Sequence, residues 1–521
     1  MKRHHRRTAL ILCIFLLFTI LPMSPAQAAS PLPSFVKVGL YYGSEGLSRA
    51  NLQNKTGYGS GYTYGTMNPD GSLNYYGTLN AVEITVQPSS STGFKITQTN
   101  SGAVLASVDF GGQDLFIVPT GNGCPRPETW FKGYTYTGSF LYHRNSYGTL
   151  NVINYVALED YIKGVIPYEM NNQWPYEALR AQALAARSYT AATMGGHKSD
   201  GFDLCNSTDC QVYRGTKSAN ETTDAAVDST AGMYITYAGS PIMAVYHASN
   251  GGATENSENI WNSTLPYLRA VADPWEAMTT TTRRSWTYEI TLSQITKLLR
   301  ARGNDCASIV HAYAEYTAAG NIGRLVFIDA NGKVLDYEGE SIRLMLRSTD
   351  YGIGISSQRL IFEDKANPRV TSPADFIPAP SGVIGTPLGT PITGSSGTLA
   401  ADAHVLTSSG LYSAQHFYGG SYPVLTSSGL TTQAMLTVTG GSQSFAPGSG
   451  TDSSGSASGA IDPLSLQIPA SSSGTFIVSG GGNGHNLGMS QFGAKGMAEQ
   501  GYTAEQIIAY YYTDVSIQRL S

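Results

Sequence analysis

The sequence predicts an α+β protein, in which a small N-terminal β domain precedes a larger domain of mixed helices and antiparallel sheet. Three observations support this fold class. Short segments of alternating hydrophobicity, broken by Gly, Ser and Asn-Pro-Asp-Gly, occupy residues 30–122, a pattern typical of small antiparallel sheets. Helical and strand-like runs are mixed over residues 125–363. Residues 364–474 are rich in Gly, Ser, Thr and Pro, which indicates an insert, and ordered segments resume over 475–521.

The individual elements of the larger domain follow from local patterns. A helix is expected over 157–163, and a longer one over 175–194, where proline stands at the first turn and alanines fill the body. A last helix is expected at about 504–512. The insert repeats Val-Leu-Thr-Ser-Ser-Gly-Leu at 405–411 and 424–430. This repeat is compatible with a small strand-rich unit or with a flexible spacer.

The first residues have the order of a secretory signal. Four Lys or Arg side chains lie within residues 1–8, an apolar run extends from Ala9 to Pro22, and Ala26-Gln27-Ala28 supplies small residues for cleavage. The apolar run is short for a membrane span, and no later stretch approaches one. We therefore expect residues 1–28 to be removed and the protein to act outside the cytoplasm, without a stable membrane span after cleavage.

Composition argues against nucleic acid as a partner. The formal net charge is -5 and charged residues make up 13% of the chain, whereas a phosphate-binding protein needs a basic face. The chain contains 33 tyrosines. A tyrosine ring is flat and apolar with a polar tip, which suits stacking on sugars as well as packing in sheets.

Glu169 lies just before the helix that carries Arg180 and Arg187. These arginines are two helical turns apart and therefore project from one face of the helix. A chain reversal after Glu169 would fold its carboxyl over that face. Apolar neighbours would raise the pKa of this carboxyl and let it hold a proton, as a general acid must. An ion pair between glutamate and arginine that joins two helices is the alternative.

Two polar loops are candidates for ligand binding. In the first, over 245–256, a strand runs into Ser, Asn and two glycines. The second, over 480–494, is dense in glycine, which lets the backbone approach a ligand or another strand closely. A hairpin turn and a packing turn, respectively, are the alternatives. The candidate sugar-binding side chains of these loops are Tyr246, His247, Ser249, His485, Ser490 and Gln491.

Cysteines suggest a further site. Cys205 and Cys210 are close in sequence, and with His197 and Asp209 they offer four possible zinc ligands, although this ligand set is unusual for a structural site. A disulfide is the alternative, because an exported protein meets an oxidising environment.

The order of these motifs resembles the stage II sporulation protein D and amidase-enhancer (SpoIID/LytB) family of bacterial wall proteins. The similarity runs from about residue 138 to 363 and resumes over 475–515. The matching motifs are Glu169-Met170, Glu177-Ala178-Leu179-Arg180-Ala181-Gln182-Ala183, Ala185-Ala186-Arg187, Cys210-Gln211-Val212-Tyr213, Tyr246-His247, Gly251-Gly252, Thr254-Glu255-Asn256, Pro266-Tyr267-Leu268, Asp273-Pro274-Trp275 and Gly488-Met489-Ser490-Gln491.

The resemblance implies a lytic transglycosylase that cuts cell-wall glycan between N-acetylmuramic acid and N-acetylglucosamine, leaving a 1,6-anhydro end. It implies that Glu169 is the acid and base, and that Arg180, Gln182 and Arg187 lie near it or bind substrate. The implied partners are peptidoglycan strands and other wall hydrolases, because some members stimulate an N-acetylmuramoyl-L-alanine amidase. No cofactor is required, and Asp209 stands where members with a zinc site often carry histidine.

Overall fold

The computed structural model describes residues 32–68, 71–121, 123–279, 285–366 and 474–520, together with the backbone of four strands between 404 and 438. The expected signal segment and most of the insert lie outside these residues. Over the part that the structure describes, no helix is long and apolar enough to cross a membrane.

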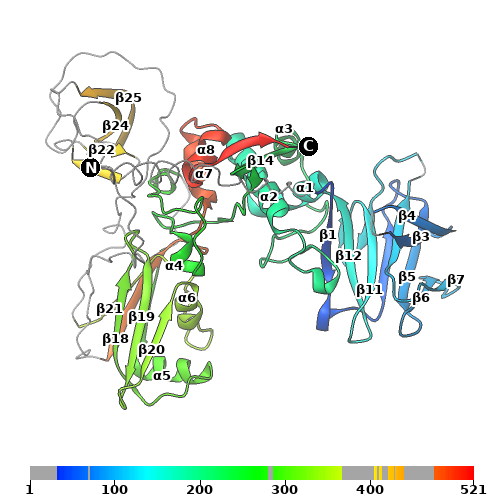
Figure 1. Cartoon of the computed structure of the whole chain (residues 1–521), viewed down its shortest axis with the longest axis horizontal. Coiled ribbons are helices and arrows are strands. Elements are labelled where there is room, and N and C mark those ends of the chain that lie inside the picture. Colours follow the sequence, from blue (N-terminus) through cyan, green and yellow to red (C-terminus); the bar gives the residue numbers. More distant parts are fainter. Residues whose placement is uncertain are drawn as a thin grey trace, which may run out of the picture. The chain divides into compact units, whose positions relative to one another are not determined.

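The N-terminal part consists of two sheets (Figure 1). A seven-stranded sheet has the order β13-β1-β12-β11-β8-β3-β4, and a six-stranded sheet the order β10-β9-β2-β5-β6-β7. Neighbouring strands are antiparallel except for β1 and β13. The sheets include strands up to residue 157, past the expected end of the N-terminal domain at residue 122, and one later strand, β13. Their strands are β1 Phe35–Tyr41, β2 Ala50–Asn54, β3 Gly61–Met67, β4 Leu73–Leu79, β5 Glu83–Pro88, β6 Gly93–Gln98, β7 Val104–Asp109, β8 Leu115–Thr120, β9 Thr129–Phe131, β10 Tyr134–Tyr136, β11 Ser139–Arg144, β12 Leu150–Ala157 and β13 Leu204–Cys205.

A group of helices follows directly on β12. The long helix α2 packs against α1, α3, α7 and α8, and its buried face is mostly alanine and leucine, so neighbouring helices approach closely. The bounds are α1 Leu158–Glu169, α2 Tyr176–Thr193, α3 Glu221–Ser229, α7 Gln491–Glu499 and α8 Ala504–Tyr511. Helix α8 begins with a capping box between Thr503 and Gln506 and confirms the helix expected there.

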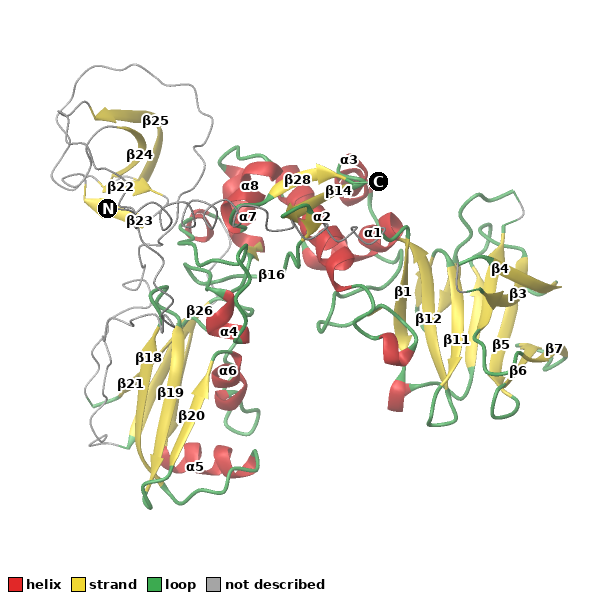
Figure 2. Ribbon diagram, viewed as in Figure 1, coloured by secondary structure: helices red, strands yellow, loops and turns green. Residues whose placement is uncertain are grey.

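A second unit of helix and sheet has its own apolar core. Helices α5 and α6 lie beside the sheet β18-β19-β20 (Figure 2), and β26, which follows the insert, pairs with both β17 and β21. The predicted return of the chain after the insert is therefore a strand at the centre of a sheet. The bounds are α4 Ser257–Trp261, β17 Ser285–Thr291, α5 Leu292–Ala301, β18 Ile309–Tyr316, β19 Ile322–Asp329, β20 Val334–Glu338, α6 Glu340–Leu346, β21 Leu360–Asp364 and β26 Thr475–Gly481.

Three small sheets complete the architecture. Strand β14 (Met233–Tyr237) lies between β15 (Ser240–Pro241) and the last strand, β28 (Ser516–Arg519), and β16 (Tyr246–His247) pairs in parallel with β27 (Met489–Ser490). The insert contains an antiparallel sheet in the order β23-β22-β24-β25, formed by β22 His404–Thr407, β23 Gly410–Ser413, β24 Gly420–Thr426 and β25 Gly429–Val438. The mixture of helices and mainly antiparallel sheets confirms the predicted α+β class.

Candidate functional site

Glu169 is the last residue of α1, and its carboxyl lies among side chains from distant segments. Gln491, the first residue of α7, donates from Nε2 to Oε2 of Glu169 at 3.0 Å. The Tyr246 hydroxyl and the backbone N–H of Val212 also lie within hydrogen-bonding reach of this carboxyl. The structure thus brings together Glu169, Tyr246 and Gln491 from the predicted set.

Burial is the main electrostatic influence on this carboxyl. Desolvation raises the pKa of Glu169, and the donors from Gln491, Tyr246 and Val212 oppose that rise in part. A carboxyl with a raised pKa holds its proton at higher pH than an exposed glutamate does. This is the property that a general acid needs near neutral pH.

Gln211 connects Glu169 to the neighbouring helices. Its Oε1 accepts a hydrogen bond from the Tyr246 hydroxyl at 2.8 Å. Its Nε2 donates to the hydroxyls of Thr190, at 2.9 Å, and Tyr161, at 3.2 Å. These donations fix which end of the amide faces Tyr246, because Nε2 is already committed. Gln211 and Val212 stand in the sequence within one of the family motifs, and no role was predicted for either residue.

Gln182 lies on the α2 side of the same site. It is fully buried, and its Oε1 accepts a longer hydrogen bond of 3.4 Å from Gln491. Its Nε2 has no partner among the described residues. Gln182 therefore supports Gln491 and has a free buried donor next to Glu169.

The two histidines hold the polar loops together. His485 Nε2 lies 3.1 Å from the Tyr246 carbonyl oxygen, and His247 Nδ1 lies 3.0 Å from the Leu487 carbonyl oxygen. Burial lowers the pKa of His485 to about 4 and that of His247 well below its usual value, so both rings are neutral at pH 7. Each ring hydrogen-bonds a backbone carbonyl oxygen of the other loop, and a contact of either ring with sugar remains a prediction.

The two predicted serines bind a carboxylate that the sequence did not reveal. Glu276 accepts hydrogen bonds from the hydroxyls of Ser249, at 2.8 Å, and Ser490, and from the N–H groups of Asn250 and Gly251. Both serines are buried. In the structure they tie the loop after β16 to the start of α7, and a contact with sugar remains a prediction.

Next to Glu276 lies a second buried carboxyl, Asp273. Its Oδ2 accepts from Asn250 Nδ2 and from the Tyr511 hydroxyl, each at 2.7 Å. Burial and the adjacent Glu276 carboxylate raise the pKa of Asp273 to about 7. The motif Asp273-Pro274-Trp275 was visible in the sequence, but the pairing with Glu276 was not.

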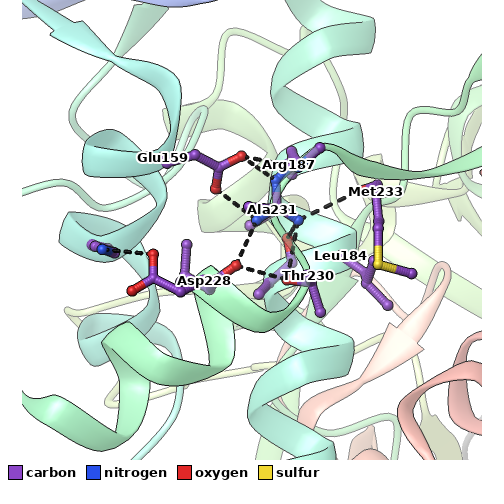
Figure 3. Close-up of polar contacts among 12 residues, drawn as sticks. Glu159, Leu184, Arg187, Asp228, Thr230, Ala231 and Met233 are labelled. Atoms are coloured by element: carbon purple, nitrogen blue, oxygen red, sulfur yellow. Dashed lines mark hydrogen bonds and ion pairs between the residues drawn. The ribbon is translucent and has the colours of Figure 1, made fainter. Parts of the chain in front are cut away.

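The structure corrects the role expected of Arg187. This side chain is fully buried, and its Nε and Nη2 donate to the two carboxylate oxygens of Glu159 at 2.9 and 2.7 Å (Figure 3). Its remaining N–H groups donate to Thr230 Oγ1 and to the carbonyl oxygens of Ala183, Val227 and Met233. Arg187 therefore neither orients Glu169 nor presents an atom to substrate, and the ion pair that joins two helices is the correct interpretation, with Glu159 as the acid.

Arg180 is also engaged away from Glu169. Its Nη1 lies 2.7 Å from Glu177 and its Nη2 lies 2.9 Å from Glu505 on α8. About a fifth of its side chain stays exposed, at 18%. Arg180 thus joins α2 to α8, and a contact with substrate remains a prediction.

The four candidate metal ligands converge. Their ligand atoms all lie within 4.8 Å of one another, with His197 Nε2 3.4 Å from Cys210 Sγ and 3.7 Å from Asp209 Oδ2. Metal–ligand bonds of about 2.0–2.3 Å in a tetrahedral zinc site place ligand atoms roughly 3.3–3.8 Å apart. The hydrogen bond between the two thiols lowers the pKa of Cys205 to about 5 and raises the pKa of Cys210, so the free pair favours one thiolate and zinc binding would displace the proton of Cys210. The residues present therefore fit a zinc ion.

Comparison with known proteins matches part of this chain to a sporulation protein family and to an amidase enhancer. Residues 146–237 match the family described as stage II sporulation protein (SpoIID). The amidase enhancer of Bacillus subtilis is 46% identical over 112 residues, which are 22% of this chain and 15% of that protein. Stage II sporulation protein D of Bacillus amyloliquefaciens is 30% identical over 213 residues, 38% of this chain and 60% of that protein. The Bacillus subtilis protein of the same name is 29% identical over 235 residues, 39% of this chain and 66% of that protein. The chain thus spans less than two thirds of each of these relatives.

Proposed function

Because the chain belongs to the stage II sporulation protein D family, we propose that it is a peptidoglycan lytic transglycosylase acting in sporulation or wall remodelling, with Glu169 as acid and base. The observation that carries this proposal is the partly buried Glu169 carboxyl, which accepts a hydrogen bond from Gln491 and has a raised pKa. Among the described residues its hydrogen-bond partners are an amide, a hydroxyl and a backbone N–H. Glycoside hydrolases of the usual kind need two carboxyl groups, whereas ring closure on the substrate's own hydroxyl needs one.

The proposed reaction uses one carboxyl group twice, first as an acid and then as a base. Protonated Glu169 gives its proton to the glycosidic oxygen while the bond from that oxygen to C1 of N-acetylmuramic acid breaks. The sugar takes up positive charge, and the carboxylate now present beside it stabilises this charge. The C6 hydroxyl oxygen then bonds to C1 and closes the anhydro ring, and its proton goes to Glu169. The enzyme is restored without water or a cofactor.

Tyr246 is placed to serve both ionisation states of Glu169. A hydroxyl has one proton to donate and two lone pairs to accept with. While Glu169 is protonated, the Tyr246 hydroxyl donates to Gln211 Oε1 and its oxygen is free to accept from the acid. After proton transfer, the same hydroxyl turns to donate to the Glu169 carboxylate. Gln211 is held by Thr190 and Tyr161, so this change needs only rotation of one O–H bond.

The direct test compares products. The full chain and Glu169→Gln are incubated with purified glycan strands, with and without stem peptides, and the fragments are analysed by mass spectrometry. Glu505→Gln is the matched control, because Glu505 is an exposed glutamate of the same helical group. Anhydro-muramic ends are expected from the unaltered protein and the control only. Their absence from every substrate refutes the reaction, and undiminished activity of Glu169→Gln refutes the assignment.

A second candidate is stimulation of an N-acetylmuramoyl-L-alanine amidase at the wall. The 46% identity to an amidase enhancer favours it. The same incubations with an added amidase distinguish the two functions. If only amide cleavage accelerates, and does so equally with Glu169→Gln, the enhancer function replaces the proposed one.

We also propose that the Cys205, Cys210, His197 and Asp209 cluster binds zinc as a structural ion in an extracytoplasmic, wall-associated protein. The convergence of four donor atoms supports this. Bound zinc would cross-link the segment that leads to Gln211 and Val212. The test is metal content of the purified protein against Cys210→Ser, with a count of free thiols. Loss of about one zinc per chain is expected, whereas metal-free protein that lacks two thiols would indicate a disulfide instead.

A further inference from the structure

A group of cations and tyrosines that the acid–base chemistry does not use lies near Glu169. It consists of Tyr41, Lys132, Tyr134, Arg214 and Lys217, and is called here the basic tyrosine cluster. Tyr41, Lys132 and Tyr134 belong to the N-terminal sheets or the turn between β9 and β10, and lie outside the family match at residues 146–237. The cluster therefore combines a family segment with a part that the match does not cover.

The cations of the cluster lie over aromatic rings. Lys217 Nζ is 4.8 Å and Arg214 Cζ 5.6 Å from the ring centroid of Tyr134. Lys132 Nζ is 5.5 Å from the centroid of Tyr41. These distances are within the range of cation–π attraction, which holds a cation in place without neutralising it.

The charges of the cluster are not compensated. In the described ranges, none of Lys132, Arg214 and Lys217 has a carboxylate within ion-pair distance, although other basic side chains of this part of the fold do have one, as Arg126 with Asp160 and Lys55 with Glu128 show. Three unpaired cations in a chain of net charge -5 make a local positive site.

The guanidinium of Arg214 is anchored through one of its nitrogens, and its other N–H donors are free within the described residues. Its Nη1 donates to the carbonyl oxygens of Asn206, at 2.7 Å, and Tyr213, at 2.9 Å. Its Nε and Nη2 bond to no acceptor in the described part of the chain, so one edge of the guanidinium is available. Such an edge binds a carboxylate through two parallel N–H···O bonds.

The cluster is linked to Glu169 through the segment that runs from Val212 to Thr216. Val212, whose N–H faces the Glu169 carboxyl, precedes Arg214 by two residues, a span of at most about 7 Å. The segment is fixed to β10 because Thr216 donates its N–H to the Thr135 carbonyl oxygen at 2.7 Å. Tyr168, the neighbour of Glu169, and Arg214 both lie close enough to Tyr136 to influence the pKa of its hydroxyl. The backbone at Arg214 therefore lies close to the Glu169 carboxyl, and Tyr134 on β10 lies against the Arg214 side chain.

We propose that the basic tyrosine cluster is a subsite for a carboxylate of the glycan, adjacent to the bond that Glu169 cleaves; this rests on the proposed function. Muramic acid carries a lactyl group, which is a free carboxylate when no stem peptide is attached. When a peptide is attached, the lactyl group is an amide and the peptide supplies carboxylates instead. Arg214 binds such a group by its free edge, the lysines add charge, and the tyrosine rings stack on the sugar.

The test removes two exposed charges and varies the ligand. Lys132→Gln/Lys217→Gln is compared with the unaltered chain on peptide-free strands, on the same strands with carboxyls converted to methylamides, and on peptide-bearing strands. Lys297→Gln/Arg347→Gln, which removes two exposed cations elsewhere, is the control. We expect a five- to tenfold rise in KM, roughly the sum of two exposed charge contacts, with kcat nearly unchanged.

Comparison of the three substrates identifies the source of the carboxylate. A KM effect on peptide-free strands that vanishes after amidation indicates the lactyl group, and an effect confined to peptide-bearing strands indicates the stem peptide. Equal KM values for the variant and the control on all three substrates overturn the proposal, as does an undiminished effect on amidated strands.

A binding assay separates this inference from the proposed reaction. Retention of peptide-free and peptide-bearing strands is measured with Glu169→Gln alone and with Glu169→Gln in the Lys132→Gln/Lys217→Gln background. If the unaltered protein makes no anhydro ends but the added lysine changes still weaken binding, the reaction fails and the subsite stands. If cleavage is confirmed and binding does not change, the subsite is refuted.

Discussion

Replacing Arg187 by methionine should destabilise the helical group strongly and should affect catalysis only through folding. The guanidinium is fully buried and makes two hydrogen bonds to Glu159, with the other bonds going to Thr230 and to three carbonyl oxygens. Methionine fills a similar length of the cavity but donates nothing. The Glu159 carboxylate would then lose its counter-charge.

The expected loss of stability follows from the burial of Arg187 and the partial exposure of Glu159. Breaking a buried ion pair by removing one partner costs about 3–5 kcal/mol. The Glu159 side chain is 33% exposed, so water can solvate it in part, and the low end of about 3 kcal/mol is expected. For a unit of 150–250 residues this corresponds to a fall in Tm of roughly 6–12 °C.

The assay is thermal unfolding followed by near-UV circular dichroism, with activity measured well below the transition. Arg180→Met is the matched control, since its partners Glu177 and Glu505 are 32% and 44% exposed, and an exposed pair contributes up to about 1 kcal/mol. The double variant Arg187→Met/Glu159→Leu should recover much of the lost stability. If Arg187→Met keeps its Tm but loses activity at low temperature, the structural role is refuted and a role at the substrate is restored.

Three further outcomes are expected. Gln491→Leu removes a donor that lowers the pKa of Glu169, so the high-pH limb of a kcat/KM profile should move to more alkaline pH; a move to lower pH would contradict the assigned contact. Tyr246→Phe should lower kcat roughly tenfold with little change in KM, because the ionised acid loses a donor, and a pure KM effect would show that Tyr246 binds substrate only. The pKa of Asp273 is raised to about 7, so the folded state binds this proton more tightly than the unfolded chain does, and the free energy of unfolding should fall as pH rises from about 4 to about 7. Asp273→Asn should reduce that slope in urea titrations, and an unchanged slope would assign it to other groups.

Local patterns predicted α2 and α8 well, ended α1 six residues too early, and did not predict α3, α4, α5, α6 or α7. They predicted the ion pairs poorly. Alanine content and proline placement identified α2, and the two-turn spacing correctly put Arg180 and Arg187 on one helix. The partner of Arg187 could not be read in the same way, because α1 carries an acid at each end, Glu159 and Glu169. In a helical hairpin, positions far from the connection face one another, and Arg187 and Glu159 both lie far from it. The carboxyl nearest in sequence was thus the wrong partner.

The polar network around Glu169 depends on contacts between residues hundreds of positions apart. Gln491 reaches Glu169 across a separation of 322 residues, and Ser490 reaches Glu276 across 214. No local periodicity records such contacts, and only a resemblance to a family of known order could suggest that these segments meet. The family resemblance did not indicate a role for Glu276 either, because a lone glutamate after Asp273-Pro274-Trp275 has no special local pattern.

The glycine-rich segment shows what the sequence did predict about the contact between these distant segments. The density of glycine indicated close approach of the backbone either to a ligand or to another strand, and the structure favours the strand. A side chain at Gly488 would meet the Val245 carbonyl oxygen at 2.1 Å, and one at Gly484 would meet the His247 side chain at 2.4 Å. Both glycines have positive φ, of 66° and 136°, which other residues rarely adopt. Glycine at these positions lets β27 lie beside β16, and this pairing delivers Gln491 to Glu169 together with Tyr246. The surroundings of Glu169 therefore depend on the backbone pairing of β16 with β27, which involves no catalytic side chain. Glu276 links the same two loops through Ser249 and Ser490.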